Sequence, residues 1–484
     1  MFWGVCVTLI MIGVFISLNT KEPANNKPIS DIKPGIKGDV EVWLTTTNQK
    51  SLLSSQQSIS PSTKAQDKQQ PNIIPIAIDE DKKYQQMDGF GASLTDASAW
   101  LIYNVLDDDA RDTLMSKLFT TEEGIGISFL RQPMGASDFA LEAYTYDDVS
   151  QGNEDFELEH FSIDRDKKYI IPLLKDALAR NPQIKVMASP WSPPAWMKTS
   201  DSMIGGMLRT ECYEVYANYF VQFIKAYEAE GIPIYAVTVQ NEPLYTPSEY
   251  PGMEMQPYEQ AKFIQDFLGP AFRDNSIQTK IICYDHNWDN PSYPKIVLEN
   301  AGEFIAGTAW HCYGGTYDAM TEVYEAFPDK EVWFTEASGG EWVPPFNDAF
   351  ADQMMHVVSA TRNYAKTVVW WNIALDQNNG PQLPEISTCR GLVTINSLTG
   401  EITYNVDYYT MGHISKFVQP GAYRIESDNY HSNVESTAFK NPDGSIVLIL
   451  SNRTIIDRKI EVVYKNSSFD YELIGKSAVT FIWN

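Results

Sequence analysis

The chain has 484 residues, which is too long for one small domain and fits a barrel of roughly 250–350 residues with a smaller unit attached. Its net charge of −26 would repel nucleic acids and anionic lipid surfaces, whereas a neutral substrate is compatible with it. Five cysteines without a CxxC pair, and no His/Cys set with zinc spacing, argue against a disulfide-dependent fold and against a metal site or other cofactor.

Residues 1–20 contain an uncharged apolar run from Phe2 to Leu18, intermediate in length between a signal-peptide core and a membrane span. No basic residue precedes the run, and no clear small-x-small cleavage site follows it. We expect an export segment, either a cleaved signal peptide or an anchor that holds the protein on a membrane, with a buried helix as the alternative. The catalytic part would then be secreted, periplasmic or anchored outside the cytoplasm.

Residues 21–72 contain a leader, a strand and a linker or loop before the main folded domain. Residues 21–38 read as a solvated leader, and residues 39–47 alternate like a β-strand. Residues 48–72 are rich in Ser, Gln, Lys and Pro, which is typical of a linker or a long loop.

Between residues 73 and 390, strand-like runs alternate with helical stretches, which predicts a closed parallel (β/α)8 TIM barrel. A helix is expected over 216–227, where aromatic and apolar residues recur at helical spacing before Gly231, and another over 352–366. The eight runs end at 88–91, 129–133, 186–191, 239–242, 282–286, 309–313, 334–336 and 369–372.

From residue 391 to 484, turn signals separate short strands, of which 446–450 and 460–464 are the clearest. This pattern predicts an antiparallel β-sandwich. The strand within 39–47 precedes the barrel and needs a sheet partner. We therefore expect the sandwich to be built from both ends of the chain.

Two glutamates end apolar strand-like runs, Glu242 after 234–241 and Glu336 after 331–335. A carboxylate at the carboxyl end of a barrel strand occupies the position where such barrels keep their chemistry. The two runs are about three βα units apart, so the side chains can face one pocket. Paired carboxylates are what cleavage of a glycosidic bond requires, and a loop carboxylate is the alternative for each taken alone.

The neighbours of the two glutamates assign their roles. Asn241 precedes Glu242, and its amide can hold a substrate hydroxyl beside the reacting carbon. Glu242 is therefore predicted to be the general acid/base, with its pKa raised by the nearby negative charge of Glu336, which would be the nucleophile.

Other polar and aromatic residues at strand ends form a predicted supporting set. Arg131 pairs with a carboxylate to position Glu336, or forms a structural ion pair. Asp138 holds sugar hydroxyls, or is a turn residue. Of the remaining candidates, Trp191 and Trp371 are expected to floor the pocket, while His311, with a core histidine as its alternative, and Tyr313 flank a passive Cys312.

Together these residues resemble glycoside hydrolase family 30, the family of glucosylceramidases and β-1,6-glucanases. The resemblance rests on five motifs in order and covers roughly residues 39–484. It implies a (β/α)8 barrel with a β-sandwich and retaining hydrolysis of β-glycosides, and it matches Arg131, Asp138, Trp191, Asn241, His311, Tyr313 and Trp371 to pocket residues. The motifs are DGFGASLTD (88–96), SPWSPPAWMK (189–198), TVQNEP (238–243), FTEA (334–337) and WNIALD (371–376).

Some positions depart from the glucosylceramidase pattern. Ala92 stands where a second glycine is common, and Trp370 replaces an acidic residue. The segment after Asp376 also differs, and CRGLVT (389–394) looks more like the glucanase branch.

The expected function is therefore hydrolysis of a β-glucosidic bond in a carbohydrate or glycolipid, glucosylceramidase-like or β-1,6-glucanase. The alternatives are a non-catalytic glycan-binding protein on the same fold, a family member acting on xylan, a fucoside or a galactan, and an unrelated hydrolase with metal or Cys/His chemistry.

Overall fold

The computed structural model describes residues 35–63, 72–344, 346–384, 387–430 and 434–484. The predicted export segment (1–20) and most of the leader (21–34) lie outside the described residues. Among the described residues, no helix has the length and apolar character needed to cross a membrane.

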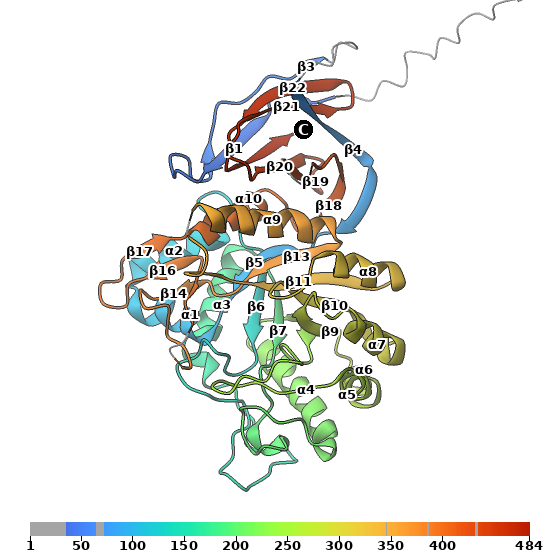
Figure 1. Ribbon diagram of the computed structural model, residues 1–484. Helices are drawn as coiled ribbons and strands as arrows, with labels where there is room; N and C mark the ends of the chain where they lie inside the picture. Colours follow the sequence, from blue (N-terminus) through green and yellow to red (C-terminus); the bar gives the residue numbers. More distant parts are fainter. Residues whose placement is uncertain (1–34, 64–71, 345, 385–386, 431–433) are drawn as a thin grey trace, which may run out of the picture.

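Within the described chain, eight parallel strands close into a barrel, as predicted (Figure 1). The spatial order β10-β11-β13-β5-β6-β7-β8-β9 follows the chain around the ring, because each strand pairs with its sequence neighbour and β13 returns to β5. The strands are β5 (Gly89–Ser93), β6 (Phe129–Pro133), β7 (Lys185–Ser189), β8 (Ile234–Thr238), β9 (Lys280–Asn287), β10 (Ile305–His311), β11 (Glu331–Ala337) and β13 (Ala365–Trp370).

The barrel interior is filled by apolar side chains that alternate along the strands, including Phe129, Met187 and Trp333. The Trp333 indole N–H donates a 2.8 Å hydrogen bond to Asp88, just before β5, and Lys185 and Lys366 pair with the same carboxylate. This cluster lies at the amino end of the strands, so it closes the bottom of the barrel and leaves the carboxyl end for function.

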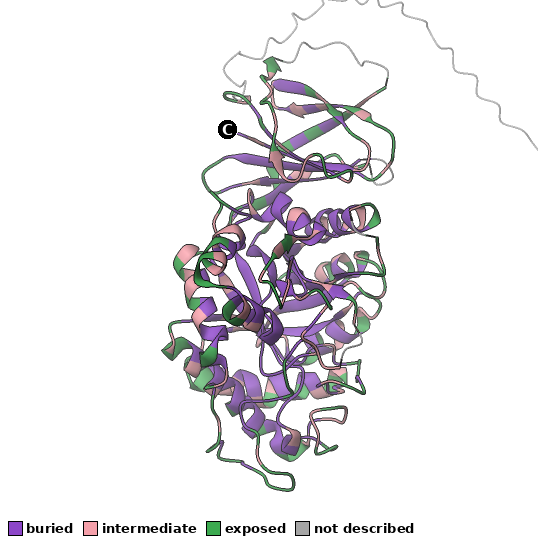
Figure 2. Ribbon diagram, turned by 90° about the vertical axis from the view of Figure 1, so that its left-hand side faces the viewer, coloured by how far each residue is buried: buried purple, intermediate pink, exposed green. Residues whose placement is uncertain are grey.

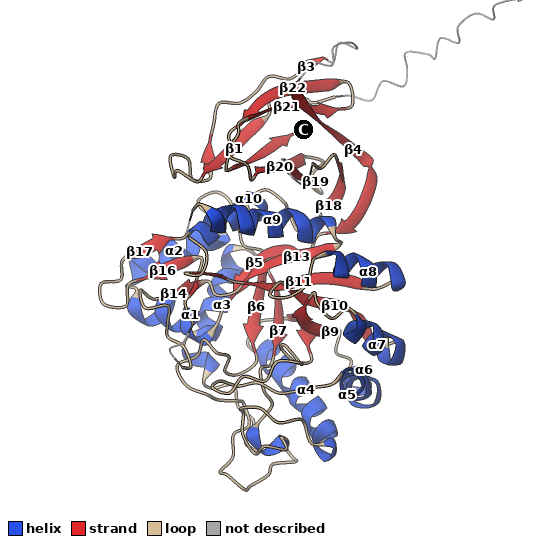
Figure 3. Cartoon of the chain, in the orientation of Figure 1, coloured by secondary structure: helices blue, strands red, loops and turns tan. Residues whose placement is uncertain are grey.

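Helices cover the outside of the barrel (Figure 3). The predicted helix over 216–227 lies within α4, which buries its aromatic residues against the barrel, and Gly231 follows it at φ +83°. The helix expected at 352–366 begins and ends four residues earlier. The bounds are α1 (Asp96–Trp100), α2 (Asp108–Phe119), α3 (Ile170–Arg180), α4 (Tyr213–Ala229), α5 (Pro257–Phe263), α6 (Gly269–Asp274), α7 (Ser292–Ala301), α8 (Asp318–Ala326), α9 (Asp348–Arg362) and α10 (Val406–Ser415).

A separate β domain contains strands from both ends of the chain, as predicted. β1 (Glu41–Thr46) pairs antiparallel with the last strand, β23 (Ser477–Trp483). The described strands of this sheet follow the order β2-β1-β23-β20-β19-β18-β4-β21-β22-β3. The others are β2 (Ser54–Ser55), β3 (Ser62–Thr63), β4 (Ile73–Gln86), β18 (Tyr423–Ser427), β19 (Glu435–Lys440), β20 (Ile446–Asn452), β21 (Arg458–Tyr464) and β22 (Ser467–Leu473).

Two predicted segment boundaries need correction. Residues 73–86, assigned to the barrel, form β4, which pairs with β21 and β18 and so joins the two halves of the β-domain sheet. Residues 391–415, assigned to the sandwich, form the hairpin of β16 (Val393–Ile395) and β17 (Ile402–Tyr404) and then α10, beside the barrel. The predicted linker or long loop over 48–72 contains, in its described part up to residue 63, the two-residue strands β2 and β3, which pair with β1 and β22.

Helices α9 and α10 lie between the barrel and the β domain (Figure 1), and the strands they cover are buried (Figure 2). His413 of α10 contacts Thr45 of β1 at 2.8 Å and Thr480 of β23 at 2.9 Å. The two ends of the chain are therefore fixed to the same helix, which anchors the β domain on the barrel.

Candidate active site

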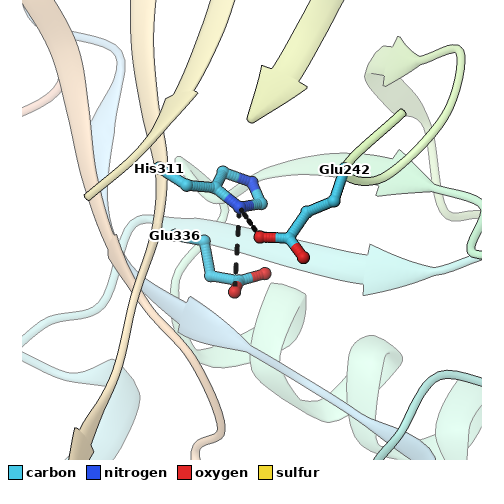
Figure 4. A group of neighbouring side chains, drawn as sticks. All are labelled: Glu242, His311 and Glu336. Carbon is cyan, nitrogen blue, oxygen red and sulfur yellow. Dashed lines mark hydrogen bonds and ion pairs between the residues drawn. The ribbon is translucent and has the colours of Figure 1, made fainter. Parts of the chain in front are cut away.

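The predicted catalytic residues converge at the carboxyl ends of the barrel strands (Figure 4). Glu242 follows β8, His311 ends β10 and Glu336 lies near the end of β11. Parallel strands end at the same edge of a barrel, so residues more than ninety positions apart in sequence meet in one pocket.

Glu336 is held by two side chains on separate strand ends. The buried guanidinium of Arg131 donates to Oε2 of Glu336, and the Tyr313 hydroxyl donates to Oε1 at 2.8 Å. Arg131 also donates to Asn241 Oδ1 at 2.7 Å. Both oxygens of Glu336 are therefore fixed in direction, as an attacking carboxylate requires.

Glu242 is held by its backbone and by His311. Its φ of +46° lies in the left-handed region, which is uncommon for a residue with a side chain. The backbone N–H of Glu242 donates to the carbonyl of Asp285 at 3.0 Å, and Nδ1 of His311 lies 3.1 Å from Oε1 of Glu242. These contacts hold a backbone conformation that directs the carboxylate toward Glu336.

The spacing of the two carboxylates is short. One oxygen of Glu242, one oxygen of Glu336 and one ring nitrogen of His311 all lie within 4.8 Å of one another (Figure 4). Nδ1 of His311 is 3.8 Å from Oε1 of Glu336. The imidazole thus faces both carboxylates.

Asp285 is a charged residue of this site that the sequence interpretation missed. Fully buried, it accepts hydrogen bonds from Arg131 at 2.9 Å and Thr335 at 2.7 Å, and its Oδ1 lies 2.9 Å from Nε2 of His311. It also ends a predicted run (282–286), so the strand-end rule that selected Glu242 and Glu336 was the available signal. Asp285 fixes both cations that lie beneath the two glutamates.

The charges of the site stabilise one another. Burial opposes the charged form of His311, but the negative charges of Glu336 and Asp285 outweigh it and raise the pKa of His311 to about 10. Burial likewise raises the pKa of Asp285, but the positive charges of Arg131 and His311 lower it by a larger amount. The pKa of Asp285 therefore lies well below its usual range. His311 is therefore a cation at neutral pH.

The expected rise in the pKa of Glu242 is not what the structure shows. Burial raises this pKa, but the hydrogen bond and the positive charge of His311 lower it by a larger amount. The pKa of Glu242 is therefore below its usual value. The prediction considered Glu336 alone. It left out the imidazolium that the fold places between the two carboxylates.

The two predicted tryptophans form a stacked pair. The rings of Trp191 and Trp371 lie 5.0 Å apart at 19°, and the Arg131 guanidinium lies 4.9 Å from the centre of the Trp191 ring. Asp138 faces the same cavity. Burial, followed by the charges of Glu336 and Glu242, raises the pKa of Asp138 to about 7.

These side chains surround a cavity of about 360 Å³. Of the predicted residues, Asp138, Trp191, Asn241, Glu242, Tyr313, Glu336 and Trp371 line it, whereas Arg131 and His311 are fully buried beneath the glutamates and contact them. Because Arg131 and His311 lie under the carboxylates, they are better placed to orient Glu242 and Glu336 than to contact a sugar. Lining residues that the sequence interpretation did not select are Tyr245, Tyr250, His286, Asn287, Ser338, Trp342, Ser387 and Cys389.

Among the described residues, Glu242, His311 and Glu336 form the one group with the spacing of a metal site. Its chemistry fits poorly, because an imidazolium has no lone pair to donate and Arg131 already neutralises Glu336. The described cysteines Cys212, Cys283, Cys312 and Cys389 are free thiols.

Family models match nearly all of the described fold. Residues 87–418 match the glycosyl hydrolase family 30 TIM-barrel domain, and residues 421–481 match the glycosyl hydrolase family 30 beta sandwich domain. The border between the two models agrees with the corrected boundary after α10.

Individual relatives agree with the family models. An endo-1,6-beta-D-glucanase of Neurospora crassa is 34% identical over 81% of this chain and 86% of its own. The lysosomal acid glucosylceramidase of Mus musculus is 29% identical over 84% of this chain and 83% of its own. A solved endo-beta1,6-glucanase superposes with a TM-score of 0.84 at 34% identity, over 92% of this chain and 99% of its own. The chain belongs to glycoside hydrolase family 30, and is thus an O-glycosyl hydrolase acting on a carbohydrate or glycoside substrate.

Proposed function

We propose that the protein is an exported retaining β-glycosidase that hydrolyses β-1,6-glucosidic bonds in a glucan by double displacement. The observation that carries this proposal is the approach of Glu242 and Glu336 to within 4.8 Å. Retaining enzymes hold their carboxyl groups about 5–5.5 Å apart, whereas inverting enzymes need roughly 6.5–9.5 Å to admit a water molecule.

In the first step, Glu336 attacks the anomeric carbon of the bound glucosyl unit. Its Oε–C1 bond forms as the C1–O bond to the leaving sugar breaks. Glu242 passes to that departing oxygen a proton drawn from the adjacent imidazolium of His311, whose Nδ1 lies 3.1 Å from Oε1 of Glu242. Arg131 and Tyr313 keep Glu336 oriented for attack. Asn241, fixed by Arg131, is in position to hold a hydroxyl of the reacting sugar.

In the second step, a water molecule gives a proton to Glu242 and attacks the anomeric carbon. The new C1–O bond replaces the ester to Glu336, which leaves as a carboxylate, so the product keeps the β configuration. Covalent capture of the sugar removes the negative charge of Glu336, one of the charges that sustain the His311 cation. At the end of the second step Glu336 is again a carboxylate, and the proton given up in the first step has been replaced.

The β-1,6-glucan substrate is supported by relatives and by one segment of the chain. Three fungal relatives at 32–34% identity are named endo-1,6-beta-D-glucanases. The segment 389–394 that resembles the glucanase branch begins with β15 (Cys389–Arg390), which pairs with β12 (Gly339–Gly340) beside Glu336, and Cys389 lines the cavity. This segment therefore lies where it can shape the substrate.

The competing substrate is glucosylceramide, because relatives at 29–30% identity carry the name glucosylceramidase. The purified protein should be incubated separately with a β-1,6-linked glucan and with glucosylceramide in detergent, and the released sugar quantified. Release from the glucan alone is expected. Release from the lipid alone would overturn the substrate assignment, and release from xylan, a fucoside or a galactan would move it to another β-glycoside. A folded protein that releases sugar from none of them would favour the non-catalytic alternative.

A further inference from the structure

Cys312 is the most accessible of the four cysteines in the described part of the chain. Cys212, Cys283 and Cys389 are buried, whereas Cys312 is partly exposed. It lines a cavity of about 430 Å³ that lies beside the catalytic cavity and shares Tyr313 with it. A small reagent that enters this second cavity can therefore reach Cys312.

His356 of α9 lines the same cavity as Cys312. It is only 9% exposed, and its Nε2 lies 3.6 Å from Oδ2 of Asp352, one helical turn earlier. Burial lowers the pKa of His356, but the charges of Cys312 and Asp352 raise it by a larger amount, to about 10. A buried imidazolium therefore lies beside Cys312 near neutral pH.

The ring of His356 is held among aromatic side chains. The ring centres of Trp288 and Phe334 lie 5.8 Å and 6.0 Å from it. Trp288 also lines the cavity and is 4% exposed, and its indole N–H has no hydrogen-bond partner among the described residues. Nδ1 of His356 likewise has none within that part of the chain. The cavity thus offers a fixed cation and an unpaired N–H donor to a small ligand with acceptor groups.

The other described cysteines lack the features that make a thiol reactive. Burial raises the pKa of Cys212 to about 11 and that of Cys389 to about 12, and it raises the pKa of Cys283 still further. A thiol attacks as its thiolate, so these three are slow nucleophiles near neutral pH. An adjacent imidazolium favours the thiolate, and Cys312 has one in His356.

Cys312 is also coupled to the catalytic centre through its neighbour in sequence. The hydroxyl of Tyr313 donates to Glu336 at 2.8 Å and lies 2.8 Å from that of Ser338. Tyr313 and Ser338 line both cavities. A group attached to the sulfur of Cys312 would occupy the second cavity next to Tyr313, and so disturb the contact that orients Glu336.

We propose that Cys312 is a modification site, at which a low-molecular-weight disulfide forms a mixed disulfide that lowers the hydrolytic activity. Sγ of Cys312 attacks one sulfur of the reagent, and a new S–S bond forms as the old one breaks. The departing thiolate takes up the proton that Cys312 gave up. His356 stabilises the negative charge on Cys312 before the attack. The proposal departs from the expectation of a passive Cys312 and does not depend on which glycoside the protein hydrolyses.

The test exposes the folded, full-length protein to 2-hydroxyethyl disulfide, which is small and neutral. Peptide mass spectrometry follows the modification of each cysteine, and hydrolysis is measured on a substrate that the wild-type protein cleaves. Cys312→Ser removes the site, and His356→Gln removes the cation. Cys389, a buried thiol at the catalytic cavity, is the internal control within the wild-type protein, so the comparison does not depend on the folding of a variant.

We expect Cys312 to react roughly tenfold or more faster than Cys389, and roughly tenfold faster in wild type than in His356→Gln. Hydrolysis should fall in step with modification of Cys312, return on reduction with a phosphine, and resist the reagent in Cys312→Ser. Equal rates at Cys312 and Cys389, or equal rates in wild type and His356→Gln, would overturn the proposal. Undiminished hydrolysis by protein fully modified at Cys312 would overturn it as well.

Discussion

Nδ1 of His311 lies 3.1 Å from Oε1 of Glu242, so the predicted acid/base rests against an imidazolium. Nε2 of the same ring contacts buried Asp285 at 2.9 Å. A proton on each nitrogen satisfies both carboxylates, which is why the ring stays charged although it is fully buried. Asp285, His311 and Glu242 therefore form a chain in which one positive charge lies between two negative charges.

This charge makes stability depend on pH. The pKa of His311 is raised to about 10 in the folded protein, above the roughly 6.5 of an unfolded chain. Its stabilising contribution is therefore complete below about pH 6.5 and is lost as the pH rises through about 10. We expect the free energy of unfolding, measured by chemical denaturation, to fall over this window by a few kcal/mol more in wild type than in His311→Gln.

His413, another buried histidine, is the control. Burial lowers the pKa of His413 to about 3, so this ring is neutral across the same window. His413→Gln should leave the slope of stability against pH as it is in wild type. An equal slope in wild type and His311→Gln would contradict the charged state of His311.

Removal of the nucleophile should abolish turnover. Glu336→Gln keeps the size of the side chain but removes the attacking charge, and we expect kcat to fall by roughly 10³-fold or more, whereas substrate binding survives. The measurement is hydrolysis by a pure, folded preparation together with binding of an oligosaccharide. The matched control is Glu331→Gln at the opposite end of β11, where the carboxylate pairs with Lys280 and Lys366. Wild-type turnover in Glu336→Gln would rule out its role.

The acid/base role of Glu242 predicts a different signature. Without the acid, a substrate with a poor leaving group should lose roughly 10²–10⁴-fold in rate, and an activated aryl glucoside much less, because its leaving group departs without a proton. Azide added to Glu242→Ala should restore turnover of the aryl glucoside and give a β-glycosyl azide. An equal loss on both substrates without azide rescue would assign the acid to another residue.

Chelation tests the metal-based alternative. Since His311 is an imidazolium paired with two carboxylates and Asp285, the Glu242, His311 and Glu336 group offers no lone pair at the ring. We expect full hydrolytic activity after dialysis against EDTA. Activity that falls on dialysis and returns with an added divalent cation would show that the site works through a metal.

The barrel and the paired glutamates could be predicted because their signals are local. A strand that is buried on both faces reads as an apolar run, and a charged residue at its end stands out, as at Glu336. Asp285 was missed because it shares its run with other polar residues, and its importance comes from partners on five other strands. The assignment of 73–86 failed since an alternating strand does not specify which sheet it joins. The lowered pKa of Glu242 depends on the placement of His311, which no sequence spacing reports.

The loop residues of the pocket could not be predicted either, because their positions also depend on distant parts of the chain. Tyr245 and Trp342 follow strand ends by several residues, and the paths of their loops are set by packing against distant segments. Trp342, for example, depends on the missing side chain of Gly340.

The central claim is that Glu242 and Glu336 are close enough for retention. The most direct measurement is proton NMR of a β-1,6-gluco-oligosaccharide during the first minutes of hydrolysis, before the anomers of the product equilibrate. The account predicts that the β anomer of the newly formed reducing end appears first and the α anomer grows in later by mutarotation. Initial release of the α anomer would show inversion and contradict the double-displacement mechanism.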